Sequence, residues 1–251
     1  MVLLIKLLLI PALLAAVTVA GRRFGPNVAG WLGSFPVVAG PVLLVITLEQ
    51  GGPFGATAAG SALAGMAAAI VFCVAYAHLS AGRSWWRTAG VAFGSWAAAV
   101  GGLALLPPAL PVAAVAGFGA LAVAPRLFPP LPPVVAPRAP HRFELPARML
   151  VGALLAVLTS WLAARFGPRL AGYLALFPLV TSVVTLFTHA VDGRAAAVNF
   201  LAGMARGLWS AGFFCLALAL LLGRTGTATA FAAATLATTV LHAWLRPRGG
   251  R

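Results

Sequence analysis

A sixteen-residue segment occurs twice in this chain, as RFGPNVAGWLGSFPVV at residues 23–38 and as RFGPRLAGYLALFPLV at residues 165–180. Ten of the sixteen aligned positions are identical, at a constant offset of 142 residues. A composition rich in Ala, Leu and Gly explains why these residues recur at aligned positions. It does not explain why Arg-Phe-Gly-Pro and Phe-Pro both recur at the same spacing. The repeat therefore predicts two copies of one structural unit. Their relative orientation becomes the central question.

The composition indicates that both copies lie in a membrane. Hydrophobic residues make up 62% of the chain, charged residues 8%, and the mean hydropathy is +1.02. Soluble domains carry about 25% charged residues, so this chain has too little charge to cover a soluble surface. The long apolar runs are rich in Ala and Leu and lack period-2 alternation, which favours helices over barrel strands. We therefore predict an all-α, polytopic integral membrane protein.

The net charge of +14 does not indicate nucleic-acid binding. The basic residues lie in short connectors between apolar runs and form no stripe with interleaved aromatic residues. Cys73 and Cys215 fall inside apolar runs without the spacing of metal ligands. The acidic residues are Glu49, Glu144 and Asp192, and the chain has no nucleophile elbow or phosphate loop. The sequence therefore predicts no enzyme, no catalytic residue, no metal and no cofactor.

The apolar runs predict nine membrane-spanning helices. They cover residues 2–20, 28–48, 56–79, 86–106, 109–126, 147–164, 170–190, 195–222 and 226–245. The Pro-rich segment 129–146 should be extended and exposed. The expected units are a first membrane repeat (1–106), a linker helix with a Pro-rich cytosolic loop (107–146) and a second membrane repeat (147–251). The first 20 residues resemble a secretory signal, but their alignment with an internal segment predicts a retained helix.

The short run 109–126 decides the symmetry of the two copies. If it spans the membrane, the second copy is inverted relative to the first; otherwise the copies are parallel. Basic residues favour the cytosolic side. Nine spans place twelve Lys and Arg residues on one side and four on the other, whereas eight spans give nine against seven. We therefore predict an inverted repeat of helices one to four and six to nine in a bacterial inner membrane, with the N-terminus outside and the C-terminus in the cytosol.

Two Phe-Pro pairs, Phe35-Pro36 and Phe177-Pro178, lie about eight residues into the second and seventh predicted helices. Proline removes a backbone hydrogen bond and frees a carbonyl group. Matching breaks in inverted repeats are typical of a substrate site near the bilayer midplane. The alternative is a kink that only improves helix packing.

A polar stripe follows the second Phe-Pro pair. It consists of Thr181, Ser182, Thr185, His189 and Asp192, which share one helical face. Most of the aligned positions in the first copy are apolar, so the stripe belongs mainly to the second copy. The alternative is that the hydroxyls bond to their own helix and help it pack, and that His189 only contacts lipid headgroups.

The eighth predicted helix carries Asn199, Gly203, Arg206 and Ser210 on one face. Arg206 lies well inside an apolar run, and such a charge is by default a functional hypothesis. Its expected partner is an anion, either a substrate or Asp192; alternatively, its side chain snorkels to the interface. Gly203 with Gly207 forms a GxxxG pair, which predicts close helix packing.

A longer motif surrounds the second copy. It combines Leu170-Ala171-Gly172 and Leu176-Phe177-Pro178 with Phe200, Gly203, Gly207 and Trp209-Ser210. This pattern, LAG-xxx-LFP followed by G-x-WS, resembles the GlpM family of small bacterial inner-membrane proteins. The resemblance implies a unit of about four helices, present here twice, although the first copy lacks the Trp-Ser part. The family is linked by name to production of the exported polysaccharide alginate, and the resemblance implies no catalytic or binding residues.

Together these features predict a small inverted-repeat transporter or permease for an unidentified solute. A basic interior with few carboxylates favours an anionic or polar solute and disfavours coupling through a carboxylate relay. The bilayer and a small solute are the expected partners. The alternative is a non-transporting partner or assembly factor of an envelope or polysaccharide-export complex, which would bind a second copy or another membrane protein. The candidate substrate-binding residues are Phe35, Pro36, Phe177, Pro178, Thr181, Ser182, Thr185, His189, Asn199 and Arg206.

Overall fold

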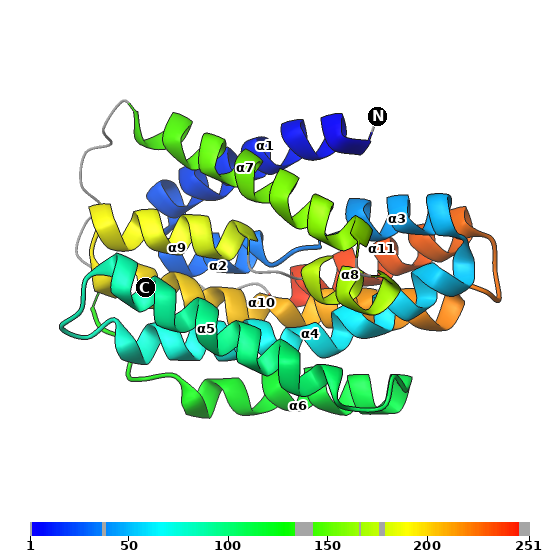
Figure 1. The fold of residues 1–251 in the computed structure, drawn as a ribbon. Helices are drawn as coiled ribbons and strands as arrows, with labels where there is room; N and C mark the ends of the chain where they lie inside the picture. The colour runs from blue at the N-terminus through cyan, green and yellow to red at the C-terminus, as the bar shows by residue number, and fades with distance from the viewer. Residues whose placement is uncertain (1, 37–38, 134–142, 166, 176–178, 246–251) are drawn as a thin grey trace.

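A computed structural model of the chain describes residues 2–36, 39–133, 143–165, 167–175 and 179–245. Regular structure in these ranges is α-helical, apart from one isolated bridge between Leu222 and Thr225, so the all-helical prediction is confirmed there (Figure 1). The described helices are α1 (Val2–Phe24), α2 (Pro26–Gly33), α3 (Ala39–Gln50), α4 (Gly52–Leu79), α5 (Trp85–Ala104), α6 (Leu110–Leu127), α7 (Glu144–Arg165), α8 (Gly167–Ala175), α9 (Leu179–Val191), α10 (Arg194–Leu221) and α11 (Thr227–Trp244).

Three of these helices, α4, α6 and α10, are long and apolar enough to cross a membrane. The second predicted span is two helices, because α2 ends at Gly33 and α3 begins at Ala39, so the predicted interruption at Phe35-Pro36 is confirmed. Large apolar side chains point outward from the helices at the rim, including Val115 of α6 and Leu236 of α11, which are 75% and 70% exposed. Such an apolar outer surface suits a lipid environment.

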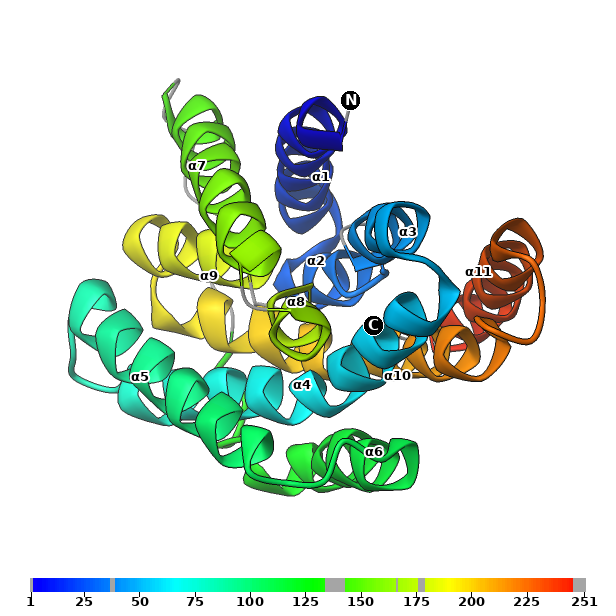
Figure 2. The same cartoon turned by 45° about the vertical axis from the view of Figure 1, so that its right-hand side comes forward.

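The 142-residue offset relates ten of the helices in pairs. It maps α1 on α7, α2 on α8, α3 on α9, α4 on α10 and α5 on α11. The agreement is closest for α4, because Gly52–Leu79 shifted by 142 residues gives the bounds of α10, Arg194–Leu221. The remaining helix, α6, lies along α4 and α10, on the side of the molecule away from α1 and α7 (Figures 1 and 2).

The paired helices α4 and α10 pack against each other in opposite directions. Gly52 at the start of α4 lies beside Gly223 just after α10, since a Cβ on Gly52 would be 3.3 Å from the Gly223 nitrogen. At the other end, Arg194 Nε at the start of α10 donates to Ser80 Oγ just after α4, at 3.1 Å. The contact at each end joins the start of one helix to the end of the other, so α4 and α10 are antiparallel.

Each half also packs a short helix against the long helix of the other half. A Cβ on Gly30 of α2 would lie 2.0 Å from the Phe200 carbonyl oxygen of α10. A Cβ on Gly172 of α8 would lie 2.2 Å from the Ala58 carbonyl oxygen of α4. These two contacts are equivalent, because both partners are related by the 142-residue offset. Glycine is required at both points, since only a residue without a side chain lets two helix backbones approach so closely.

The interior is filled mainly by α4 and α10. Phe72 and Tyr76 of α4 and Phe200 of α10 are among the largest fully buried side chains. They belong to one apolar cluster with residues of α1, α5 and α9, while a second cluster joins α4 and α10 to α3, α6 and α11. The interrupted helix and the polar residues of α9 are therefore held by two long, rigid helices.

Candidate functional site

The interruption between α2 and α3 is supported by hydrogen bonds on both sides. Ser34 Oγ donates to the Trp31 carbonyl oxygen at 2.6 Å, within the last turn of α2. The carbonyl oxygen of Pro36 accepts a bond from the Gly40 nitrogen at 2.8 Å, at the start of α3. Pro36 is buried and Phe35 is half-buried. The chain thus leaves the helix inside the protein, where its backbone groups still need polar partners.

An aromatic and polar cluster covers this interruption, and it includes a histidine that sequence analysis missed. The His242 ring of α11 stacks on Trp31, with ring centres 4.3 Å apart and planes 10° apart, and it meets the edge of Phe35 at 5.1 Å. Its Nδ1 lies 2.7 Å from Ser210 Oγ of α10. Ser210 gives its hydroxyl hydrogen to the Gly207 carbonyl oxygen. The histidine nitrogen must therefore be the donor in the Ser210–His242 bond.

Polar atoms of this cluster are buried without a hydrogen-bond partner. They are Trp31 Nε1 and His242 Nε2. Because His242 donates through Nδ1, a neutral ring leaves Nε2 as an acceptor. The N–H group of Trp31, on which this ring stacks, is a donor. Buried polar groups in proteins are normally paired, and an exception calls for an explanation. The cluster can therefore offer both donors and acceptors to a small polar molecule.

The second Phe-Pro pair, Phe177 and Pro178, lies outside the described residues. The polar stripe that follows it on α9 is buried, with Thr181 2% exposed and Ser182 and Thr185 fully buried. Thr185 Oγ1 has no hydrogen-bond partner, so the alternative in which every hydroxyl bonds to its own helix does not hold for this residue.

His189 lies at the far end of the same stripe and contacts α4. Its Nδ1 is 2.9 Å from the hydroxyl oxygen of Tyr76, and the two rings meet edge to face at 5.8 Å. The ring is half-buried and bonded inside the protein. The alternative in which His189 only contacts headgroups is therefore wrong.

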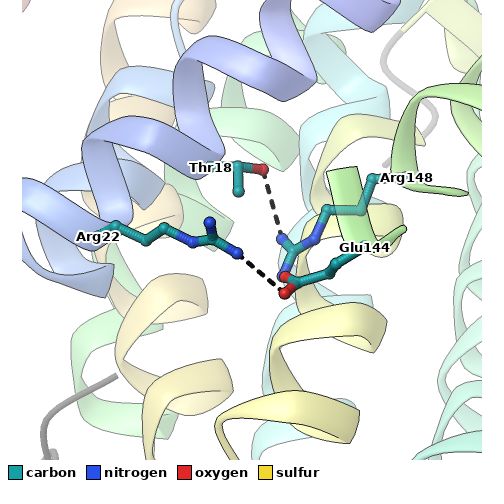
Figure 3. Close-up of polar contacts among 4 residues, drawn as sticks. All are labelled: Thr18, Arg22, Glu144 and Arg148. Atoms are coloured by element: carbon teal, nitrogen blue, oxygen red, sulfur yellow. Dashed lines mark hydrogen bonds and ion pairs between the residues drawn. The ribbon is translucent and has the colours of Figure 1, made fainter. Parts of the chain in front are cut away.

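A buried ion-pair cluster joins α1 and α7 (Figure 3). The Glu144 carboxylate accepts from Arg148 Nη2 at 2.6 Å and from Arg22 Nη2 at 2.9 Å. Arg148 Nη1 also lies 3.5 Å from Thr18 Oγ1. The side chains of Glu144 and Arg148 are 4% and 2% exposed, whereas that of Arg22 is 34% exposed. Both charges of the inner pair are thus removed from water, and each depends on the other for stabilisation.

A cavity of about 40 Å³ adjoins this cluster. Its polar lining includes Thr18, Arg22, Arg148, Thr188 and Asp192. Arg148 Nε is buried without a partner, and the cavity is large enough for water, which needs about 10–15 Å³. Asp192 and Arg148 thus line the same small cavity. Arg206, the predicted partner of Asp192, lines a different cavity between α6 and α10.

Sequence analysis placed Glu144 in the exposed Pro-rich linker and counted Arg148 only as a connector charge. The structure instead begins α7 at Glu144 and buries both residues. The sequence did indicate that these two residues could form an ion pair, since Glu144 and Arg148 are four residues apart with the acidic residue first, as in a stabilising helical pair. The burial of the Glu144–Arg148 pair could not be predicted from the sequence, because Arg22 and Thr18, which contact the pair, belong to a helix about 120 residues away.

Residues on the predicted polar face of α10 contact two different neighbours, α2 and the chain after α6. Gly203 and Gly207 face α2, since a Cβ on either would lie 2.0 Å or less from Asn27 or Ser34, which confirms the predicted close packing of this GxxxG pair. Asn199 instead donates from Nδ2 to the Pro132 carbonyl oxygen at 2.9 Å, fixing the chain after α6.

Arg206 is exposed and lines a cavity of about 480 Å³ between α6, the chain that follows it, and α10. Among the residues that the structure describes, Phe35 does not line the cavity that contains Arg206. The predicted substrate-binding residues therefore fall into separate groups, at the interruption, along α9 and beside α6.

Arg169 is a further polar residue that sequence analysis missed, because it was counted only as a connector charge. Its guanidinium donates to the Leu103 carbonyl oxygen at 3.0 Å and to the Leu106 carbonyl oxygen. Tyr173 Oη donates to the same Leu103 oxygen at 3.3 Å. These groups bond to carbonyls at the end of α5 and just after it, where helical hydrogen bonding stops. They also border a cavity of about 220 Å³.

Comparison with known proteins adds no relative to this description. No family model, no curated protein and no solved structure matches the chain. Among the described residues, no group of three or more His, Cys, Asp or Glu side chains is placed to hold a metal ion. The resemblance of residues 170–210 to the GlpM family stays a prediction.

Proposed function

We propose that the protein is a small membrane transporter built from an inverted repeat, with nine membrane crossings in the bacterial inner membrane. In this arrangement α2 with α3 forms one crossing, as does α8 with α9. The proposal is supported by the 142-residue correspondence of ten helices and by the antiparallel packing of α4 with α10. Inverted repeats of this kind are typical of secondary transporters.

One observation carries the proposal. The helix is interrupted at Ser34–Pro36, inside the protein, where α2 crosses the long helix of the other half. Irregular backbone at membrane depth is tolerated only where it is buried in protein or lines a water-filled cavity. In transporters, such interruptions at the interface of two repeats form the solute site. The buried atoms without partners, Trp31 Nε1 and His242 Nε2, lie at this point.

A polar solute at the interruption would give these atoms the hydrogen bonds they lack. The predicted residues Phe35 and Pro36 lie at the same point. Thr185 of α9 belongs to a separate group, and its buried hydroxyl also lacks a hydrogen-bond partner. The tryptophan N–H is a donor, and the chain has few carboxylates to repel an anion. We therefore expect an anionic or polar solute.

Flux into proteoliposomes tests this function directly. Purified protein is reconstituted, and uptake of labelled inorganic phosphate, sulfate, chloride and gluconate is compared with uptake by protein-free vesicles. We expect uptake of at least one anion, lowered about tenfold by Trp31→Phe and Thr185→Val, since one lost hydrogen bond to a charged solute is worth about 1.5–3 kcal/mol. Thr239→Val is the matched control, because this hydroxyl is exposed and bonds to its own helix.

Folded protein that moves none of the four anions faster than protein-free vesicles would contradict the anion-transport proposal. The alternative, a non-transporting partner of an envelope or polysaccharide-export complex, would then take its place. It predicts that the protein is recovered from native membranes with other subunits of such a complex, and that Thr185→Val leaves this recovery unchanged.

The inverted arrangement has its own test. Cys73 and Cys215 are buried and are replaced by alanine to give a background without native thiols. Single cysteines are then placed at Arg23 and Arg165, which are equivalent positions of the repeat. A membrane-impermeant maleimide should label them from opposite sides of the membrane. Labelling of both from the same side would exclude the inverted model.

A further inference from the structure

A cavity of about 480 Å³ lies where α6 ends against α10, and Arg206 is the charged residue among the described residues that line it. Its walls include the Phe128–Leu131 segment after α6 and Trp209 of α10. We propose that this cavity binds the phosphate headgroup of an anionic phospholipid. The proposal rests on the membrane placement suggested above, but it does not depend on transport. It gives Arg206 a different role from the solute binding predicted by the sequence.

The charge of Arg206 has no counterpart nearby. No hydrogen bond or ion pair joins Arg206 to the residues that the structure describes, and its side chain is exposed. Two of the three acidic residues, Glu144 and Asp192, lie at the separate cluster around Arg148, and Glu49 does not line this cavity. A guanidinium offers planar donors that match a phosphate group and are weakly hydrated. The missing partner of Arg206 is therefore best supplied by an anion.

The surrounding elements place Arg206 near the edge of the hydrocarbon layer. α6 ends at Leu127, whose carbonyl oxygen lies 2.7 Å from His78 Nε2 near the end of α4. The chain after α6 is not helical, and Asn199 holds it against α10 through Pro132. Because irregular backbone does not face hydrocarbon, this segment marks the level at which the headgroups begin.

The length of α10 agrees with this position. Its 28 residues extend about 42 Å, some 12 Å more than a hydrocarbon core of about 30 Å. Arg206 is twelve residues after the first residue of α10, or about 18 Å along its axis. If the excess length lies on the Arg194 side, Arg206 is about one turn inside the hydrocarbon. A long arginine side chain spans that distance and reaches the headgroups.

The walls of the cavity suit a lipid better than a free ion. They are mostly apolar, and Trp209 stacks on Phe118 of α6 with ring centres 5.7 Å apart. Tryptophan is enriched at the level of the headgroups, where its ring contacts both acyl chain and polar groups. The opposite side of α10, marked by Gly203 and Gly207, packs against α2. The cavity thus lies on the outer side of α10, away from the interruption.

Lipid retention by the full-length protein tests the proposal. The protein is purified in a mild detergent, given equal amounts of phosphatidylglycerol and phosphatidylcholine, and examined by native mass spectrometry. We expect the wild type to retain phosphatidylglycerol, and Arg206→Gln to lower this retention about fivefold, as for the loss of one basic contact with an anionic lipid. Arg126→Gln is the matched control, because Arg126 is exposed in the last turn of α6 but does not line the cavity.

The outcomes separate the lipid from other occupants. Equal retention of phosphatidylglycerol by Arg206→Gln and Arg126→Gln would overturn the proposal. Displacement of the lipid by millimolar inorganic phosphate would also overturn it, in favour of a soluble anion. Neither result depends on flux, so failure of this site leaves the proposed transport function standing, and failure of transport leaves this site standing.

A second measurement keeps the proposal testable if Arg206→Gln does not fold. Brominated phosphatidylglycerol should quench the tryptophan fluorescence of the wild-type protein in vesicles more than brominated phosphatidylcholine does. The excess quenching should disappear in Trp209→Phe, because Trp209 lines the cavity. Equal quenching by the two lipids in the wild type would contradict a site for anionic headgroups.

Discussion

The two crossings of the repeat, α2 on α10 and α8 on α4, share a backbone arrangement but differ in their side chains. At both, a glycine of the short helix meets a carbonyl oxygen of the long helix, at Gly30 with Phe200 and at Gly172 with Ala58. The crossings also exchange partners between halves, since each combines a short helix of one copy with the long helix of the other. Neither crossing therefore belongs to one copy alone.

The side chains at equivalent positions of the two crossings behave differently. Arg169 and Tyr173 of α8 bond to the last carbonyls of α5. The aligned residues of α2, Asn27 and Trp31, leave Asn27 Oδ1 and Trp31 Nε1 buried without a partner. The polar side chains of the α8 crossing thus bond within the protein, while the α2 crossing leaves buried polar atoms without hydrogen-bond partners. Duplication preserved the packing, because glycine is required there, and left the surrounding chemistry free to diverge.

The glycines at the two crossings should give the largest effect. Gly30→Ala and Gly172→Ala each place a Cβ within 2.2 Å of a backbone oxygen, which forces the two helices apart, so we expect each to prevent recovery of folded protein. Gly119→Ala is the control, because a Cβ there meets no atom within 4 Å and alanine favours a helix by about 1 kcal/mol. Size-exclusion chromatography in detergent measures the recovery of folded protein, and thermal unfolding in detergent measures its stability. Tolerance of one substitution only would show that the crossings are not equivalent.

The ion-pair cluster is a second place where equivalent positions differ, since Val2 and Lys6 align with Glu144 and Arg148. Glu144→Gln leaves the buried Arg148 without its carboxylate, so we expect a loss of about 3–5 kcal/mol in the free energy of unfolding. Glu49→Gln, at an exposed position, should change it by about 0.5 kcal/mol or less. The free energy of unfolding of the two variants is compared with that of the wild type in detergent at neutral pH. A loss as small as that of the control would mean that Arg148 finds another partner.

Removal of Arg169 should have an intermediate effect confined to the α8 crossing. Arg169→Gln removes charged hydrogen bonds to the carbonyls at the end of α5, and bonds of this type contribute about 1.5–3 kcal/mol each. We expect lower thermal stability, with the end of α5 exchanging its amide hydrogens faster. Asn27→Ala, the equivalent change at the α2 crossing, should cost less, because Asn27 Oδ1 has no partner to lose. Equal losses would contradict the proposed difference between the crossings.

The smallest effect should be a gain in stability. Thr238 Oγ1 of α11 is buried without a partner, one turn before His242. Thr238→Val therefore replaces an unpaired polar group by an apolar one of similar shape, and it should raise the free energy of unfolding by about 1 kcal/mol. If this group serves a solute, the same variant should slow flux into proteoliposomes. A variant that is less stable than the wild type would show that the hydroxyl is in fact paired.

Local patterns in the sequence predicted much of the framework. The repeated segment located the described helix interruption, because proline at position 36 lacks the N–H group that would continue the helical hydrogen bonds. The pair Gly203 and Gly207 predicted a close helix contact, which α2 occupies. Both predictions rest on backbone geometry that a few neighbouring residues determine. The connector charges and the apolar runs likewise indicated a helical membrane protein.

The site could be predicted only in part, because its contacts join distant segments. His242 was not a candidate, although it bonds Ser210 and stacks on Trp31. Helical spacing placed Asn199 and Gly203 on one face, but α2 and the chain after α6 divide that face between them. Spacing along a helix gives a direction around its axis, and it contains no information about which neighbour lies there.

The amino-acid sequence alone thus determined the duplication, the helical class and the position of the described interruption, since each depends on residue types at short spacing. The tertiary structure decided that the two halves exchange their short helices and that Glu144 is buried between Arg22 and Arg148. It also decided that Asn27 Oδ1, Trp31 Nε1 and His242 Nε2 are buried without hydrogen-bond partners at the α2 crossing. These features depend on distances between residues far apart in the chain, and only packing of the whole fold sets those distances.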